Sequence, residues 1–422
     1  MIDKGFYEMR NVWNVKRDDN LNFILPLDVN LYQSEYVKKK RILIVIHMHY
    51  LDSIEYYFQW INEIPQEIDI IFTISNKDLE KKIEENINRK KGCYRIFYKK
   101  NRGRDISALL VASRKEILNY EYVCFIHDKK ARNEKIKKDV ASWIKLLWEN
   151  TIGSSKYIEN IIYTFECNTE LGMLVPPIHI SPNFRHVFSN AWEKNFDNTA
   201  KIAEDLTLSC DLDKEKSPIA IGTVFWAKVD ALRKLLEVDW KYEDFMEEPL
   251  PADGTFSHAI ERILPYVAQD AGYSTGWIMT TETAGERMEY LTEVLTEAFA
   301  FMKEEHGIAD ILDLHSYQNY KKMLGIISER HKKIYIYGAG VWGAKCVNLI
   351  NSLNIKVEAI LVTKKTENYR DIKGIPIVEL STVQLDNNAG VIVAVNYEWR
   401  DEIISQIHSQ FESFENIYML YE

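Results

Sequence analysis

The sequence predicts an α/β protein with a larger amino-terminal domain and a smaller carboxy-terminal one. In two stretches, 41–128 and 332–421, short apolar runs rich in β-branched residues alternate with amphipathic helical segments. The length of 422 residues also exceeds what one domain usually holds. Alternation of this kind predicts mostly parallel sheets with helices on both faces.

The first stretch contains four predicted strands, at 41–50, 67–75, 94–100 and 121–128, with helical segments between them. Polar residues follow each apolar run, and the carboxyl ends of parallel strands are where such sheets bind ligands. Two further strands are predicted in LGMLVPP and IAIGTVFWAK, which are separated by a long, aromatic insertion at 177–217.

These patterns divide the chain into four parts. Residues 1–40 form a mixed amino-terminal extension, and 41–282 form the first α/β domain. Residues 283–330 form a helical connector, because apolar side chains recur on one helix face between 291 and 302. Residues 331–422 form the second α/β domain.

Composition excludes several function classes. The net charge of −10 argues against nucleic acid as a partner, so any polyanion must bind locally. Five scattered cysteines without a CxxC motif indicate neither a disulfide framework nor a zinc site. No apolar run reaches the length of a membrane span. We therefore expect a cytoplasmic protein, with peripheral association at the inner membrane face left open.

The segment NRGRDIS joins a predicted strand to a helix, where free backbone N–H groups favour phosphate. Asn101, Arg102, Arg104 and Asp105 are the candidate donor-binding residues here. An arginine fork suits a diphosphate or a pyrimidine edge, and Asp105 suits a ribose hydroxyl. The alternative is a helix cap at Asp105 beside solvated arginines.

The strand ending FIHDKKA supplies His127, Asp128, Lys129 and Lys130 as further donor-binding candidates. Asp128 is a candidate metal ligand, although one carboxylate makes a weak site for a divalent ion. The two lysines can instead neutralise phosphates directly. The alternative is a solvated run of charges.

Asp253, in EEPLPADGTFSHAIER, is the candidate catalytic base. A carboxylate at a helix N-terminus stays ionised, and a base must be ionised to accept a proton. Glu247 and Glu248 are the competitors, and simple helix capping is the alternative. His258 and Glu261 lie three residues apart and are predicted to form an internal pair.

In the second domain YGAGVWG places Gly338, Gly340 and Gly343 between a strand and a helix, as in dinucleotide-binding turns. A ribose-binding acid should follow the second strand, but LVTKKT stands there. We therefore do not expect NAD(P) as a cofactor; the other interpretation keeps these glycines as cofactor-binding residues.

Five motifs taken in order, NRGRDI, IHDKKA, LGMLVPP, GTVFWAKVDAL and DGTFSHAIER, resemble the rhamnan synthesis protein F family over roughly 40–280. The resemblance implies a GT-A-like glycosyltransferase domain acting in bacterial cell-wall and surface polysaccharide synthesis. The order of these motifs also resembles the family 2 glycosyltransferases, and that resemblance implies that 101–105 hold the nucleotide, that Asp128 and its neighbours face the diphosphate, and that Asp253 is the base. The second DxD carboxylate is missing, which puts a Mg²⁺ or Mn²⁺ requirement in doubt.

We therefore expect an inverting glycosyltransferase. Its donor would be a dTDP- or UDP-sugar, with rhamnose or a related deoxysugar favoured. Its acceptor would be a growing polysaccharide or lipid-linked glycan. Two alternatives stay open: a nicotinamide-dependent sugar-modifying enzyme centred on the second domain, and a non-catalytic partner in polysaccharide assembly. Oligomerisation is also left open.

Overall fold

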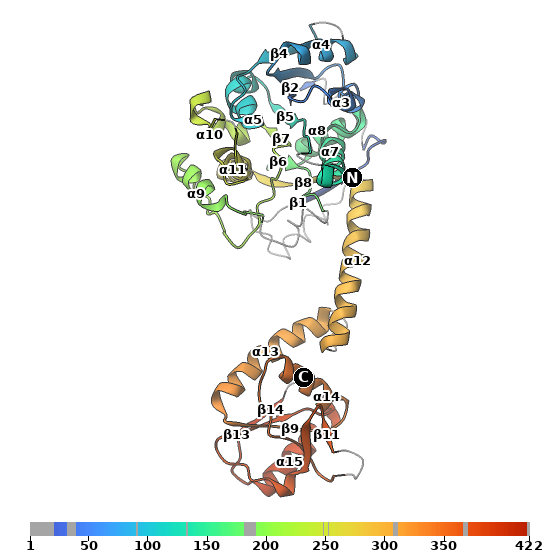
Figure 1. The fold of residues 1–422 in the computed structure, drawn as a ribbon, viewed down its shortest axis with the longest axis vertical. Coiled ribbons are helices and arrows are strands. Elements are labelled where there is room, and N and C mark those ends of the chain that lie inside the picture. The colour runs from blue at the N-terminus through green and yellow to red at the C-terminus, as the bar shows by residue number, and fades with distance from the viewer. Residues whose placement is uncertain are drawn as a thin grey trace. The chain divides into compact units, whose positions relative to one another are not determined.

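The computed structural model describes residues 21–31, 39–89, 92–131, 134–180, 191–247, 249–251, 253–306, 311–365 and 370–419. Side chains at 305, 306 and 311–318 are also outside this description. The chain forms two compact units, Met1–Arg287 and Met288–Glu422 (Figure 1). Both are built on largely parallel sheets with helices on their faces, so the predicted α/β class is confirmed.

The first unit contains an eight-stranded sheet in the order β1-β8-β6-β7-β5-β2-β3-β4. Only β7 runs antiparallel to its neighbours. The strands are β1 (Leu21–Leu25), β2 (Ile42–His47), β3 (Asp69–Ile74), β4 (Tyr94–Tyr98), β5 (Tyr122–His127), β6 (Leu171–Val175), β7 (Phe225–Lys228) and β8 (Ser274–Thr280).

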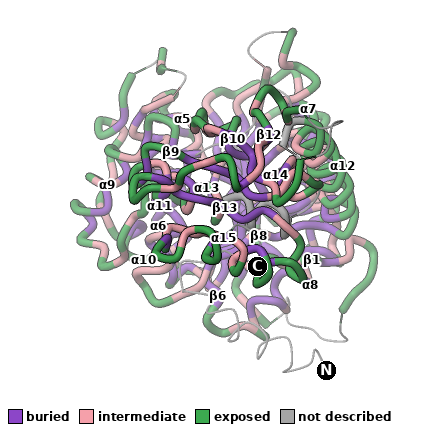
Figure 2. Tube along the Cα trace, turned by 90° about the horizontal axis from the view of Figure 1, so that it is seen from below, coloured by how far each residue is buried: buried purple, intermediate pink, exposed green. Residues whose placement is uncertain are grey.

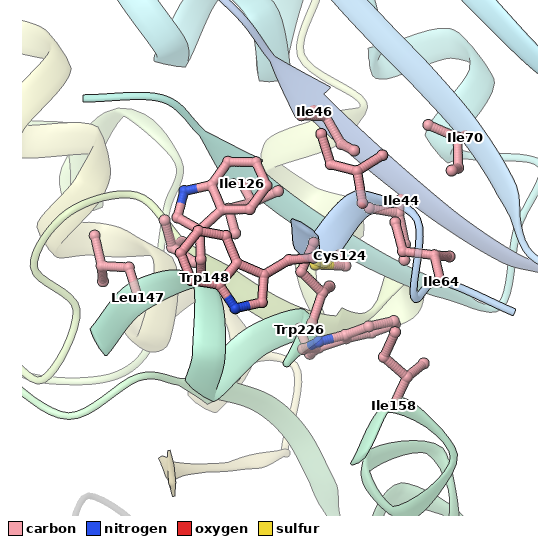
Figure 3. Packing of buried hydrophobic residues seen from close by; sticks show 14 of the residues in the cluster. Ile44, Ile46, Ile64, Ile70, Cys124, Ile126, Leu147, Trp148, Ile158 and Trp226 are labelled. Carbon is pink, nitrogen blue, oxygen red and sulfur yellow. The ribbon is translucent and has the colours of Figure 1, made fainter. Parts of the chain in front are cut away.

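Alternate side chains of each central strand enter separate cores on the two faces of this sheet. Ile44 and Ile46 of β2 pack with Trp148 and Trp226 in one core (Figure 3), whereas Leu43 enters the other. The first core is covered by α3 (Ile54–Ile61), α4 (Lys77–Asn86), α7 (Lys137–Ile152) and α8 (Ser155–Cys167). The second is covered by α5 (Arg104–Ser107), the π-helical turn η1 (Ala108–Ala112), α6 (Arg114–Ile117), α9 (Phe196–Asp205), α10 (Arg233–Leu236) and α11 (Phe256–Asp270).

The second unit contains a six-stranded sheet in the order β11-β12-β10-β9-β13-β14. Only β11 is antiparallel to its neighbour. Its strands are β9 (Lys333–Tyr337), β10 (Ala359–Val362), β11 (Asp371–Ile372), β12 (Ile375–Glu379), β13 (Ala389–Val393) and β14 (Ile417–Met419). Its helices are α12 (Thr281–His306), which begins in the first unit, α13 (Ile311–Arg330), α14 (Val341–Ser352) and α15 (Arg400–Gln410).

The burial map shows the strands of both units mostly buried and the outer helix faces exposed (Figure 2). The range 1–40, set apart above as an extension, contributes the edge strand β1, which pairs with β8 along its whole length. Within the described residues, no helix combines the length and apolarity needed to cross a membrane.

Candidate functional site

The candidate site lies where the strand order of the first sheet reverses direction. The chain builds β2, β3 and β4 outward on one side and then returns to place β5 on the other side of β2. In open α/β sheets the crevice outside such a reversal is the usual ligand site. His47 and His127, which end β2 and β5, are register partners at this point.

Both histidines are almost completely buried, with 4 % and 8 % of their surface exposed. His47 Nδ1 lies 2.9 Å from the carbonyl oxygen of Thr73 on the adjacent strand. The two ring nitrogens of His127 lie 2.8 Å from the Asp128 carbonyl oxygen and 2.7 Å from that of Gly222. Burial lowers the pKa of both imidazoles, with a further contribution from a lysine near each, so both are neutral at pH 7.

Charged side chains surround this histidine pair. Asp105 Oδ2 lies 3.7 Å from His127 Nε2, and Lys129 Nζ lies 3.2 Å from the same nitrogen. Burial by itself raises the pKa of Asp105, but the neighbouring His127 and Lys129 outweigh it and hold this pKa below its ordinary value. Burial lowers the pKa of Lys129 to about 8. The site therefore contains an ionised carboxylate beside a lysine that stays protonated at neutral pH.

Two features hold Lys129 in place. Its ammonium group stands 4.4 Å from the centre of the Trp143 ring, a cation–π contact. Its backbone N–H donates to the Tyr57 hydroxyl at 3.0 Å. A second lysine, Lys99, is 7 % exposed and its charge contributes to the lowered pKa of His47, so it too lies near the strand ends. Lys99 and Lys129 are set against Asp105 and a partly ionised Asp128, whose pKa is about 7, so the cluster has a small net positive charge, which suits an anion.

Thr223 connects the cluster to helix α11. It adopts a left-handed backbone conformation, with φ of 49°, directly after Gly222. Its hydroxyl donates to Glu261 Oε2 at 2.8 Å and also lies against the Asp105 carboxylate. Glu261 pairs with buried Arg262. The predicted His258–Glu261 pair is therefore absent, because each side chain bonds to another partner.

The NRGRDIS loop begins helix α5, as predicted, but its two arginines differ in role. Gly103 and Arg104 both have positive φ, and a Cβ at Gly103 would lie only 2.6 Å from the Phe245 ring. The Arg102 guanidinium donates to the Phe245 carbonyl at 2.7 Å and also pairs with Glu247. Arg102 thus fastens the loop to the 243–247 segment. Asn101 is exposed at the tip of the same loop.

Asp128 and Lys130 also have specific partners. Asp128 is 3 % exposed, and its Oδ2 accepts the backbone N–H groups of His49 and Tyr50 at 2.8 and 2.7 Å. Burial raises the pKa of Asp128 to about 7. Lys130 is exposed and forms an ion pair with Asp52. These contacts make Asp128 a poor fit for a divalent metal, and the described residues contain no cluster of three His, Cys, Asp or Glu arranged to hold one.

Asp253 precedes α11 and is not its cap, because Thr255 caps the helix and forms a reciprocal capping box with His258. Asp253 Oδ1 accepts a hydrogen bond from Asn195 at 2.7 Å, and Oδ2 accepts one from the Lys194 backbone at 3.2 Å. Partial burial by itself raises the pKa of Asp253, but these hydrogen bonds outweigh it and the pKa is lowered. Asp253 is therefore ionised at neutral pH.

His258 links this carboxylate to the switch-point cluster. Burial lowers the pKa of His258 and the charge of Asp253 raises it. Arg262 and Arg104 lower this pKa further, and Asp105 raises it. The candidate base and the cationic cluster thus belong to one neighbourhood of the first unit. Of the two competitors for the base, Glu247 is exposed and paired with Arg102, and Glu248 lies outside the described residues.

Comparison with known families adds an independent observation. The profile of the family described as "Rhamnan synthesis protein F" matches residues 7–273, which is more than half of the chain. The protein belongs to the rhamnan synthesis protein F family. The matched range includes all the switch-point residues and Asp253, and it ends before the second unit begins.

Two relatives from strains of Xanthomonas campestris pathovar campestris, both called "Uncharacterized protein WxcX", are 29% identical to this chain over 235 residues. That alignment covers 54% of this chain and 32% of each relative. The chain therefore spans about a third of the length of these curated relatives. Their names describe no activity.

The glycine-rich turn of this rhamnan synthesis F protein lies in the second unit, outside the family match. Gly338 has φ of 116° and a Cβ there would lie 2.5 Å from the Ala394 carbonyl oxygen, while a Cβ at Gly343 would lie 1.9 Å from the Gly338 carbonyl oxygen. Of the three glycines of this turn, Gly340 alone has open space around its Cβ position. Two of the three glycines are thus required by chain packing alone. Thr363, where a ribose-binding acid would stand, bonds to Tyr337 and Gln406.

Sequence reasoning missed several members of the site. The threonine at 223 is itself inconspicuous, because one threonine in an apolar run is ordinary in a strand. Lys99 is hidden in the basic run YKKNRGR. A weak signal for Thr223 did exist in the preceding glycine, since a glycine just before a strand often marks an unusual backbone conformation.

Proposed function

We propose that the first unit is a glycosyltransferase of surface polysaccharide synthesis, with a nucleotide sugar as donor and a growing glycan as acceptor. Membership in the rhamnan synthesis protein F family supports a role in polysaccharide synthesis. Transfer from a diphosphate-linked donor is supported mainly by one observation. Lys99, Asp105 and Lys129 form a net positive cluster at the switch point of a parallel sheet. A diphosphate is the anion that such a crevice suits in a sugar transferase.

In this proposal Lys129 and Arg104 face the donor diphosphate. Lys129 is protonated at neutral pH and is held over Trp143, so its charge is already oriented before the donor arrives. Arg104 sits at the start of α5, and its charge reaches His258. Asp105 is assigned to a ribose hydroxyl and to orienting His127, which lies 3.7 Å away.

The reaction is proposed to proceed by direct displacement. The Asp253 carboxylate removes the proton of an acceptor hydroxyl, and the resulting oxygen attacks the anomeric carbon of the donor. The bond between that carbon and the diphosphate oxygen breaks, and the configuration inverts. Negative charge then grows on the leaving diphosphate, where Lys129 and Arg104 stabilise it.

Three of the residues first assigned to the donor are given structural roles here. Arg102 has its donors committed to the 243–247 segment, Asp128 accepts two backbone N–H groups, and Lys130 pairs with Asp52. We assign no metal-dependent step, because the described residues place no group of acidic side chains around Asp128 that could hold a metal ion with it. Asn101 and His127 remain donor-side residues in the proposal.

The proposal is tested by following thermal unfolding of the full chain with dTDP, UDP and NAD in separate samples. Binding at a hundredfold excess over the dissociation constant adds about 2.7 kcal/mol to the free energy of unfolding. We expect protection by dTDP or UDP and none by NAD. Protection by NAD alone would favour the nicotinamide enzyme. A chain that neither binds nor turns over any nucleotide sugar in a panel would be an assembly partner instead.

A further inference from the structure

Asn195, the residue that precedes α9, is a fully buried side chain whose amide contacts the proposed base. Its Nδ2 donates two hydrogen bonds, one to Asp253 Oδ1 at 2.7 Å and one to the Trp192 carbonyl oxygen at 3.1 Å. Its Oδ1 is also buried, and no hydrogen-bond partner for it lies in the described part of the chain. An unpaired buried amide oxygen is unfavourable, so the arrangement needs an explanation.

The surroundings of this amide fix its orientation. The Asp253 carboxylate and the Trp192 carbonyl both accept hydrogen bonds, so the amide nitrogen has to face them. Turning the amide by 180° would set its oxygen against two acceptors. Oδ1 of Asn195 is therefore left unpaired because Nδ2 serves the Asp253 carboxylate.

The segment that carries Asn195 is held firmly against α11. The Trp192 side chain is 2 % exposed and stacks on Tyr266 of α11, with 5.9 Å between the ring centres. Arg262 of α11 donates through Nε to the Ala191 carbonyl oxygen at 3.2 Å. The backbone N–H of Asn195 donates to the same Trp192 carbonyl that accepts its side chain. Because packing and hydrogen bonds restrict this amide, it sets the orientation of the carboxylate rather than following it.

The electrostatic surroundings of Asp253 give the contact a second consequence. Partial burial raises the pKa of Asp253, and the hydrogen bond from Asn195 is the largest of the contributions that lower it. The titratable and charged residues near Asp253 are Glu193 and Lys194 from the segment before α9, and His258 and Arg262 from α11. Without the amide, the carboxylate would take up a proton at higher pH.

We propose that Asn195 is a positioning residue, which orients the Asp253 carboxylate for proton transfer from the acceptor. This inference rests on the proposed function, since Asp253 acts as a base only if the first unit transfers a sugar. Asn198 of α9 offers a contrast within the same helix. It is exposed, and its Nδ2 donates to the Gly254 carbonyl oxygen at 3.1 Å, so it contacts the same loop without touching the carboxylate.

Asn195→Ala and Asn198→Ala test this inference as a matched pair. Each removes a side-chain bond to the 253–254 loop, but only Asn195→Ala removes a bond to the carboxylate. In Asn195→Ala we expect turnover to fall by about 10–100-fold. The acidic limb of the pH–rate profile should move to higher pH, with the KM for the donor unchanged. Asn198→Ala should keep the turnover and the profile of the unchanged protein.

Titration of Asp253 by ¹³C NMR gives a readout that needs no turnover. In protein labelled at the aspartate carboxyl carbons, the Asp253 signal is identified by its absence in Asp253→Asn. Its midpoint should move to higher pH in Asn195→Ala and stay in place in Asn198→Ala. An unchanged protein that transfers no sugar would overturn the proposed function, whereas an unmoved midpoint in Asn195→Ala would overturn the role of Asn195.

Thermal unfolding of each variant separates these effects from loss of the fold, because Asn195 is buried. If Asn195→Ala is unfolded at the assay temperature, Asn195→Asp makes the same test while keeping the shape of the side chain. A second carboxylate beside Asp253 should move the midpoint to still higher pH. Turnover and titration that are the same in the Asn195 variants as in Asn198→Ala would limit Asn195 to holding the chain and overturn the proposal.

Discussion

The two units contain the same kind of crevice but equip it differently. In each unit the order in which parallel strands are added to the sheet reverses. The reversal lies between β2 and β5 in the first unit and between β9 and β13 in the second. In the first unit charged side chains converge there, including half-buried Asp105 and Lys129. In the second unit the glycine-rich turn lies there instead, and Gly338 approaches the Ala394 backbone so closely that a Cβ would not fit.

The comparison shows that a strand order creates a place for a ligand without determining whether one binds. Gly338 and Gly343 follow the pattern of a dinucleotide turn, yet their small size is already explained by contacts within the chain. Lys129 and Asp105 of the first unit also have partners within the chain, but both have shifted pKa values and lie at the strand ends, which is the pattern of a candidate functional site. Our proposal therefore assigns the chemistry to the first unit.

The largest effect that we expect comes from a substitution in the first unit, and it is on catalysis. Asp253→Asn keeps the size of the side chain and its amide oxygen can still accept a hydrogen bond, but it removes the base. Transfer should fall by about 10²–10⁴-fold. Donor affinity should not change, because Asp253 is assigned to the acceptor. Initial rates and calorimetric titration of the same preparation measure the two effects.

Asp205→Asn provides the matched control, because this exposed aspartate is the last residue of α9, at the opposite end of that helix from Asn195, which bonds to Asp253. Its transfer rate should equal that of the unchanged protein. If Asp253→Asn retained full turnover, Asp253 would have to be removed from the role of base.

A smaller effect is expected in the second unit, on stability alone. Gly343→Ala forces a methyl group against the Gly338 carbonyl oxygen and should destabilise this unit by about 1–3 kcal/mol. Gly340→Ala meets open space and should be tolerated. Denaturant unfolding of both variants measures the difference, and nucleotide-sugar binding should be unaffected in either. Equal stabilities would show that packing does not explain the glycines.

A further expected effect is a pH dependence. The pKa of Lys129 is about 8 in the folded protein against 10.5 for an ordinary lysine. Affinity for a diphosphate should therefore fall as pH rises through about 8. Stability should move the other way, rising between about 8 and 10.5, because the unfolded chain binds the proton more tightly. Lys129→Arg should remove both trends, since arginine keeps its charge throughout; trends that persisted in this variant would assign the titration to another group.

Much of the fold could be predicted because buried parallel strands are visible as apolar runs. The strands at 41–50, 67–75, 94–100 and 121–128 correspond to β2 to β5. Strand direction could not be predicted in the same way. An antiparallel strand such as β7, fully inside the sheet, carries the same apolar run as a parallel one. The edge strand β1 was missed, because it is short and alternates in burial.

The candidate site was predictable in outline and not in detail. Strand ends are visible in the sequence, so 101–105 and 127–130 could be named. Which of their side chains point into the crevice depends on register and loop packing. Arg102 and Arg104 differ by two positions, yet only Arg102 is fastened to the Phe245 backbone. The contact between Thr223 and Glu261 joins residues from separate elements that no local pattern connects.

The central claim is that the switch-point cations of the first unit hold the donor diphosphate. Calorimetric titration of dTDP and UDP into Lys129→Met and Lys130→Met tests it most directly, because these lysines are adjacent in sequence but only Lys129 lies in the crevice. We predict that Lys129→Met weakens binding of the preferred nucleotide by about 10–100-fold and that Lys130→Met leaves it unchanged. Unchanged affinity in Lys129→Met, or equal losses in both variants, would contradict the claim.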